Sequence, residues 1–221
     1  MLSTFESQTV IAHKYMLTVF RFSDLNQKAM YQFSKKVFLL ACLSLGFIAF
    51  NGFSQQSYEV ADKPEMKVSG TSTLHDWNMV SSEASGSASL RVSAGKVTSI
   101  STAKFSMPVK ALKSGKGQMD NNAYKALEAD NHPQISFTLL EANQDGGNGW
   151  KATGRLQIAG ESRTVPFQLR VAPQGNSVRV NGSAKIKLTD FGLEPPTAVF
   201  GTIKTGDEMT ITIDMNLNPV N

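Results

Sequence analysis

The chain has 221 residues, of which 41% are hydrophobic and 18% charged, and its formal net charge is +4. This length fits one β-rich domain behind a targeting segment. Residues 1–54 hold five of the 22 basic residues and two of the 18 acidic ones, so residues 55–221 carry 17 against 16, a net charge of +1. The near-neutral balance excludes the broad basic surface typical of nucleic-acid-binding proteins.

The N-terminal segment has the pattern of a secretory signal peptide. Lys35 and Lys36 precede an almost unbroken apolar run at 37–50, and small residues follow at Gly52 and Ser54. A basic region, an apolar region and a small-residue cleavage site occur in this order in exported proteins. The run is too short for a confident transmembrane helix. We expect cleavage near Ser54, a periplasmic or secreted mature chain, and no stable membrane insertion after cleavage.

Two features of this segment leave alternatives open. Met1 and Met30 both precede the apolar run, so either is a candidate start of translation. Leu39–Cys42 faintly resembles a lipoprotein box, but only five apolar residues separate Lys36 from Cys42, which is short for a signal. We therefore favour cleavage over lipid anchoring. Because Cys42 is the only cysteine, the mature chain has none, which excludes thiol catalysis and thiolate metal binding.

The rest of the chain alternates between apolar and polar residues with period two, which is typical of half-buried strands. His75–Asn78 interrupts the pattern and predicts a bend or strand junction, and loops rich in Gly, Asn and Pro separate the later runs. Strands are expected at 66–74, 84–92, 96–109, 135–139, 150–158, 165–171, 178–188 and 209–217.

A single helix is expected in this β-rich part, at 118–129. Its apolar residues, Met119, Ala123, Ala126 and Leu127, recur at three- and four-residue spacing. His132–Pro133 prevents the helix from continuing. The narrow apolar stripe suits a helix that packs at the side or end of a barrel.

These elements predict an all-β fold of eight antiparallel strands in successive hairpins, closed as a barrel or folded as a sandwich. The polar faces carry Lys, Arg and Thr in mid-strand and no aromatic belt repeats, unlike an outer-membrane barrel. The apolar faces therefore point inward.

Small residues occupy the middle of several inward faces: Gly70, Gly86, Ala88, Ala103, Ala152, Gly154, Gly182 and Ala184. A barrel of eight strands either fills with side chains or holds one small ligand. Small residues leave room for a ligand, but they also admit large neighbours such as Trp150 and Phe167. Both alternatives stay open at this point.

Several segments resemble the YceI-like family of periplasmic polyisoprenoid-binding proteins. They are Met107–Gly115 with Met119–Asp120, Tyr124–Leu127, His132–Phe137, Gly154–Leu156, Gly160–Phe167 and Asp190–Leu193, within a match of roughly 57–217. The resemblance implies a lipocalin-like, eight-stranded antiparallel barrel that holds an isoprenoid or other lipid tail in an apolar interior. It makes the 107–137 region a lid or gate, whose Lys110, Lys113 and Lys116 form a solvated rim.

We expect the ligand to contact inward-facing side chains of the barrel wall. The candidates are Phe105, Met107, Phe137, Leu156, Phe167, Leu169, Val180, Ile186, Ile211 and Ile213. His75, Asp76 and Trp77 form a possible mouth. They would contact a polar head group, or else serve the structure alone, with Trp77 in the core or rim and Asp76 orienting His75; we favour the structural role.

No catalytic, metal or cofactor site is expected. The sequence has no Gly-x-Ser-x-Gly turn and no telling acidic pair, and His75 and His132 are the only histidines of the mature chain. The leading hypothesis is a lipid-binding protein without catalysis. The alternatives are a structural or partner-binding module with a filled core and, less favoured, an enzyme acting on a lipid around His75.

Overall fold

The computed structural model describes residues 55–61 and 63–220. The expected signal peptide, with Met30, the apolar run 37–50 and Cys42, lies outside the described residues. The statements below concern the described residues of the compact unit Ser54–Asn221.

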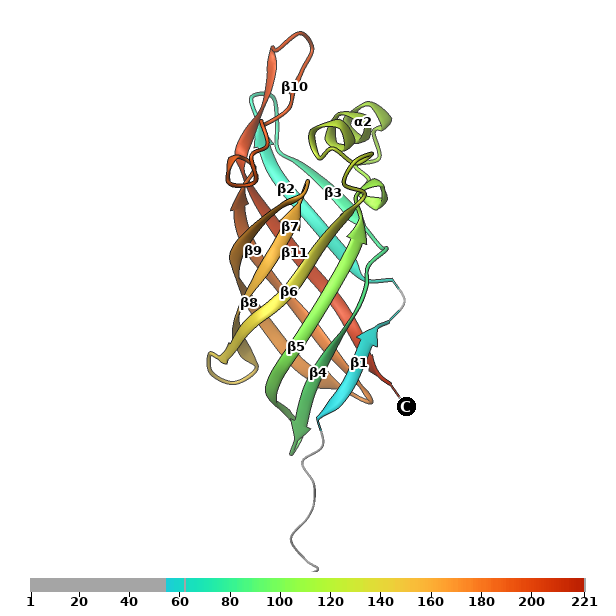
Figure 1. Cartoon of the computed structure of the whole chain (residues 1–221), viewed down its shortest axis with the longest axis vertical. Coiled ribbons are helices and arrows are strands. Elements are labelled where there is room, and N and C mark those ends of the chain that lie inside the picture. Colours follow the sequence, from blue (N-terminus) through green and yellow to red (C-terminus); the bar gives the residue numbers. More distant parts are fainter. Residues whose placement is uncertain (1–54, 62, 221) are drawn as a thin grey trace, which may run out of the picture. The chain divides into compact units, whose positions relative to one another are not determined.

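Strands make up most of this unit (Figure 1). They are β1 (Gln56–Val60), β2 (Glu65–Ser72), β3 (Trp77–Ser81), β4 (Ser85–Ser93), β5 (Lys96–Pro108), β6 (Gln134–Gln144), β7 (Gly149–Ile158), β8 (Glu161–Gln174), β9 (Ser177–Lys187), β10 (Thr197–Ala198) and β11 (Ile203–Pro219). Two short 3-10 helices, η1 (Val109–Ala111) and η2 (Thr189–Phe191), and one α-helix, α2 (Gly117–Ala126), complete the described elements.

Eight of these strands form a closed ring of antiparallel pairs, in the order β1, β4, β5, β6, β7, β8, β9 and β11, and β11 pairs with β1 to close it. β10 pairs with the start of β11. The predicted all-β fold, a lipocalin-like antiparallel ring of eight strands with one helix, is confirmed.

The long strand β11 meets two different partners along one edge. Near its C-terminal end Leu217 pairs with Val60 of β1, whereas its earlier part, from Thr205 to Asp214, pairs with β2. β2 in turn forms a hairpin with β3. Beyond β3 the wall continues only through a two-residue bridge, in which the Val80 and Lys113 backbones exchange hydrogen bonds of 2.8 and 2.9 Å.

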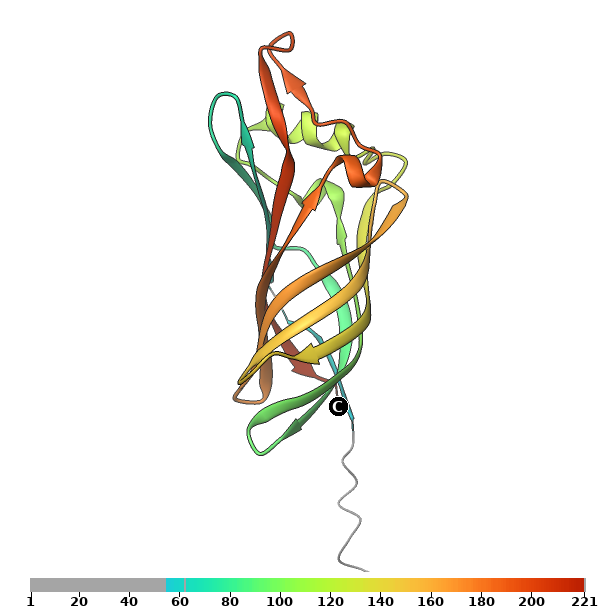
Figure 2. The ribbon, with the colours of Figure 1, turned by 90° about the vertical axis from the view of Figure 1, so that its left-hand side faces the viewer.

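The helix lies at one end of the ring, together with the β2–β3 turn and the β10–β11 turn (Figures 1 and 2). We call this the open end. The opposite end, which carries the β4–β5, β6–β7 and β8–β9 turns and the C-terminus, is the closed end (Figures 1 and 2). The position of α2 agrees with the expected packing of the helix at the side or end of the barrel.

Several local expectations differ from the structure. The sequence did not predict β1, whose five residues include only one buried side chain, Tyr58. The expected strand junction is present as the turn between β2 and β3, but it is shorter than 75–78, because β3 begins at Trp77. The helix ends at Ala126 rather than Ala129, because Glu128 adopts a left-handed conformation with φ of 50°.

The closed end is filled by a hydrophobic core. Its most deeply buried members are Leu90, Val97, Val171, Val178 and Leu217, each at most 2% exposed. They come from β4, β5, β8, β9 and β11, so this core joins both sides of the ring. Its packing closes one end of the barrel interior.

Leu217 offers a test of ring closure. Replacing a buried leucine with alanine removes apolar contact and leaves a cavity, at a cost of roughly 2–5 kcal/mol. We expect Leu217→Ala to lower the free energy of unfolding by about that amount in urea titration. Asn216→Ala, on the exposed face of the same strand, is the matched control and should change it by less than about 0.5 kcal/mol. Equal effects of the two substitutions would contradict the closing role of the β1–β11 pair.

Candidate functional site

An apolar cavity of about 450 Å³ occupies the interior between the closed-end core and the open end. This volume lies within the range of roughly 300–1,000 Å³ that is typical of small-ligand sites. Its deepest lining includes Leu90, Val171 and Leu217, which belong to the closed-end core. Its upper lining includes Leu74 and Ile203, at the turns of the open end. The cavity therefore runs from a packed floor toward the end that carries α2.

All ten predicted wall residues line this cavity: Phe105, Met107, Phe137, Leu156, Phe167, Leu169, Val180, Ile186, Ile211 and Ile213. They come from β5 to β9 and from β11, and half of them, including Phe137 and Ile211, are only partly buried. Because they face the interior of a closed ring, that partial exposure reports contact with the cavity.

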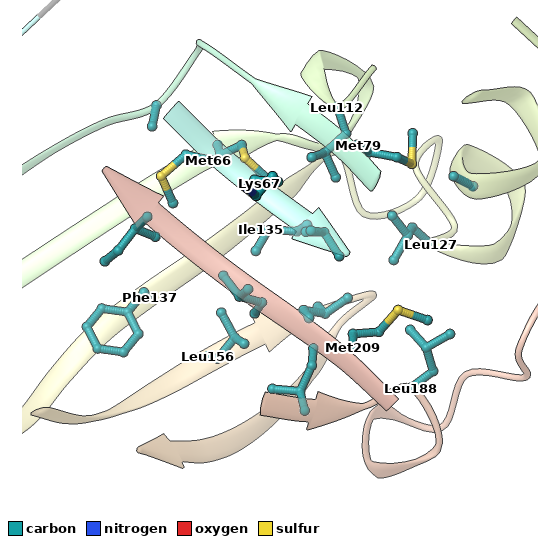
Figure 3. A pocket seen from close by; sticks show the side chains of 18 of the residues that line it. Met66, Lys67, Met79, Leu112, Leu127, Ile135, Phe137, Leu156, Leu188 and Met209 are labelled. Atoms are coloured by element: carbon teal, nitrogen blue, oxygen red, sulfur yellow. The ribbon is translucent and has the colours of Figure 1, made fainter. Parts of the chain in front are cut away.

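Sequence reasoning missed several methionines of the cavity wall. Met66, Met79 and Met209, from β2, β3 and β11, line the cavity, and Leu127 and Ile135 lie nearby (Figure 3). Methionine is flexible and polarizable, so it adapts to apolar surfaces of varied shape. The alternation of apolar and polar residues at 66–74 and 209–217 already placed Met66 and Met209 on the inward face. Met79 lies in β3, which was not predicted.

The small inward residues explain how the wall is built. A Cβ added at Gly154 would collide with the Phe137 ring, and one added at Gly70 would collide with Trp77. These glycines therefore make room for large neighbouring side chains, which was one of the two alternatives that the sequence left open. The centre of the barrel nevertheless remains open. Phe137 also contacts Phe167 edge-on, with ring centroids 5.3 Å apart.

The predicted mouth residues have different roles. His75 and Trp77 line the cavity, whereas Asp76 does not. The Trp77 indole N–H donates to the Thr71 carbonyl at 3.0 Å, and His75 Nδ1 lies 2.8 Å from the Asp76 backbone oxygen. The contact that holds the His75 ring is therefore to the backbone of Asp76 and not to its carboxylate.

α2 covers part of the open end. Met119, Ala123 and Leu127 face the cavity, as the predicted apolar stripe requires. Gln118 and Asn122, on the adjoining face of the helix, also reach the lining, and their side chains share a 3.2 Å hydrogen bond. The helix thus places apolar side chains over the interior and polar ones at its edge.

Residues 55–61 and 63–220 contain neither a candidate metal site nor a candidate membrane-spanning helix. No group of three or more His, Cys, Asp or Glu side chains is placed to hold a metal ion. No helix in this range combines the length and the apolar composition needed to cross a membrane.

A family model described as the YceI-like domain matches residues 55–217. The chain belongs to the YceI-like family. A search of curated proteins found no match to it.

Solved structures share the fold of this YceI-like domain. BcnA from Burkholderia cenocepacia is 19% identical, with 69% of this chain and 95% of that chain covered and a TM-score of 0.58. A polyisoprenoid binding domain from Saccharophagus degradans is 12% identical, with 76% and 100% covered and a TM-score of 0.55. The YceI protein of Campylobacter jejuni is 16% identical, with 63% and 82% covered and a TM-score of 0.51.

In this YceI-like chain, a buried carboxylate ties α2 to the segment before it. Asp120, which is 8% exposed, accepts hydrogen bonds from the Ser114 hydroxyl at 2.6 Å and the Ser114 amide at 2.7 Å. The Ser114 hydroxyl lowers the pKa of Asp120 most, against the opposing effect of burial, and the Ser114 amide and Lys113 lower it further. The ionised carboxylate is therefore the form that holds this connection.

Tyr124 makes a second tie on the same helix. Its hydroxyl donates to the Leu112 carbonyl at 2.6 Å and accepts from Lys113 Nζ at 2.8 Å. The hydrogen bond with Tyr124 raises the pKa of Lys113 above its ordinary value of 10.5. Together with Asp120, this tie joins α2 to the segment that bridges to β3 through Lys113.

The tie at Asp120 predicts a dependence on pH. Because its pKa is lowered in the folded chain, its stabilising contribution is complete above the unfolded pKa, roughly 3.9, and disappears as the pH falls through the lower folded value. An NMR titration should place the Asp120 pKa below 3.8, and Ser114→Ala should raise it. An Asp120 that titrates at its ordinary value in both proteins would contradict the tie.

A substitution tests the same tie at neutral pH. Asp120→Ala should speed amide exchange across 113–126, with little change at the closed end. Asn121→Ala, on the exposed side of α2, is the control. Equal exchange in the two variants would show that Asp120 does not hold the helix.

Proposed function

We propose that residues 55–221 form a binding protein that holds a long apolar chain, such as an isoprenoid or another lipid tail, without chemistry of its own. The observation that carries the proposal is the apolar cavity of about 450 Å³, closed by a packed core at one end and partly covered by α2 at the other. Family membership supports it, as does the Saccharophagus degradans neighbour, which is described as a polyisoprenoid binding domain.

Apolar contact supplies the affinity in this proposal. Each methylene group that leaves water contributes roughly 0.8 kcal/mol, so ten of them contribute on the order of 8 kcal/mol before the costs of association and ordering. The lining offers few polar partners along its depth, and the closed-end core blocks passage through the barrel. A flexible hydrocarbon tail fits such a surface better than a polar ligand does.

The polar groups indicate how such a ligand would be oriented. Lys116, Gln118 and Asn122 reach the lining from α2 and the residue before it, and His75 reaches it from the β2–β3 turn. All four belong to segments at the open end, whereas Lys67, Ser106 and Ser136 reach the lining from β2, β5 and β6. We therefore place a polar head group there, with the tail directed toward Leu90 and Leu217 at the floor.

The filled-core alternative is less favoured because the interior retains a cavity even though glycines admit large neighbours. An enzyme centred on His75 is also less favoured. That side chain is exposed, and its ring contacts the backbone oxygen of Asp76. A general base would need an orienting group and a nucleophile within hydrogen-bond reach.

We further propose that the chain is exported to the periplasm or secreted, with a mature protein that starts near Gln55. The support is the basic and apolar order of residues 35–54. The family match begins next to the expected cleavage site, at residue 55. N-terminal sequencing of the exported protein tests this proposal.

The direct test is extraction of the natively purified protein with organic solvent, followed by mass spectrometry. We expect a long-chain lipid in the extract, at a ratio to protein well above that of an unrelated exported protein purified in parallel. The absence of any enriched lipid, combined with failure to bind added fluorescent lipids, would overturn the carrier proposal.

A cavity-filling substitution separates a carrier from a filled scaffold. Ile211 is partly buried and lines the cavity, whereas Thr210 next to it points to the other face of β11. We expect Ile211→Trp to reduce lipid binding about tenfold or more while the unfolding midpoint changes little, because the new ring enters open space. Thr210→Trp should leave binding unchanged. Strong destabilisation by Ile211→Trp would indicate a packed interior.

A further inference from the structure

The open end carries three exposed apolar side chains on two neighbouring turns. Phe200 is fully exposed, Leu74 is 65% exposed and Val199 is 62% exposed. We call these three residues the apolar tip. Scattered exposed apolar residues are common, but a fully exposed phenylalanine that follows an exposed valine, with an exposed leucine on the neighbouring turn, indicates an interaction surface.

Hydrogen bonds hold the two turns side by side. The Thr73 amide donates to the Lys204 carbonyl at 2.9 Å, and the Lys204 amide donates to the Thr73 hydroxyl at 3.1 Å. Within the β10–β11 hairpin, Ala198 pairs with Ile203, and the Thr202 amide donates to Val199 at 3.1 Å. The exposure of Phe200 therefore belongs to a bonded hairpin, which projects beyond α2 at the open end (Figures 1 and 2).

The backbone of the hairpin turn is strained at the same residues. Val199 and Phe200 have φ of 51° and 53°, in the left-handed region that glycine and asparagine normally occupy. A β-branched and an aromatic residue at these positions disfavour the turn, and folding alone does not require side chains that contact nothing in the core. Strain of this kind clusters at functional segments.

The apolar tip is continuous with the cavity. Leu74 itself lines the cavity, and so do Ala198 and Ile203, the pair at the root of the turn that carries Val199 and Phe200. A hydrocarbon chain leaving the cavity at this point would meet apolar side chains before it met water. Because such a chain is poorly soluble, the phase that supplies or accepts it is itself apolar.

The charges nearby do not oppose contact with a phospholipid surface. From Pro195 to Gly206 the only charged residue is Lys204, and no carboxylate occurs. On the neighbouring turn Asp76 follows Leu74 at a distance of two residues, so the two turns together carry no excess of positive charge. Contact would therefore rest on apolar insertion, with little dependence on anionic lipid.

From this arrangement we propose that the apolar tip docks the open end onto a lipid bilayer, with Phe200 inserted among the acyl chains, so that a tail passes between bilayer and cavity without crossing water. The proposal rests on the proposed function. It adds the partner, a phospholipid bilayer, and the residues that meet it. Phenylalanine and leucine favour the apolar side of such an interface.

The test uses residues 54–221, which contain the whole ring and its core clusters, and vesicles of phosphatidylcholine with and without phosphatidylglycerol. Phe200→Ser should weaken vesicle co-sedimentation about tenfold or more, the size expected when one phenyl group no longer leaves water. Leu140→Ser removes another exposed apolar side chain, from β6, and should leave vesicle binding unchanged. Unchanged binding in Phe200→Ser, or equal losses in both variants, would overturn the proposal.

Two further assays measure separately the insertion of residue 200 into the bilayer and the binding of lipid in the cavity. In Phe200→Trp, lipids that carry a quencher on the acyl chain should reduce fluorescence above the background of the other tryptophans, and the absence of such quenching would overturn docking by the tip. Phe200→Ser should bind a fluorescent lipid added in solution as the parent protein does, but exchange it with vesicles more slowly. If neither protein binds the fluorescent lipid while vesicle binding still depends on Phe200, the cavity function fails and the docking residue stands.

Discussion

The closure of the ring by β11 is the constraint on which the rest of the structure depends. One edge of this strand pairs with β9 from Glu208 to Leu217, but the other edge is divided between β1 near Leu217 and β2 from Asp214 back to Thr205. The short β1 closes the ring only near its packed end. Toward the open end the wall is completed by the β2–β3 hairpin and the bridge between Val80 and Lys113.

This division of one edge explains why the helix and its ties are at the open end. The bridge makes Lys113 part of the wall, and α2 begins a few residues later, at Gly117. Asp120 and Tyr124 then join α2 to the bridging segment through Ser114 and Leu112. The ring, the bridge and the lid are consequently one connected structure, and loosening Asp120 would loosen the cover of the cavity and not its floor.

Period-two alternation was enough to predict most of the fold and the cavity wall, because a closed ring forces every apolar face inward. Phe105 and Ile213, far apart in sequence, were both assigned to the wall on this basis and both line the cavity. β1 escaped prediction because it buries only one side chain, so its five residues show no clear alternation. Val199 and Phe200 escaped because a turn has no periodicity, and its exposure depends on how neighbouring turns are held.

The glycines decide how a barrel with many large side chains keeps an open centre. At Gly154 and Gly70 the missing Cβ lets the ring of Phe137 or Trp77 lie against the backbone of a neighbouring strand. A ring in that position covers the wall without reaching across the interior. The sequence left two alternatives open: small residues that make room for a cavity, or small residues that make room for large neighbouring side chains. In the structure, packing the large side chains against the glycines is what leaves the cavity open. A larger residue at Gly154 would therefore displace Phe137 toward the centre, so the size of the cavity depends on positions that do not line it.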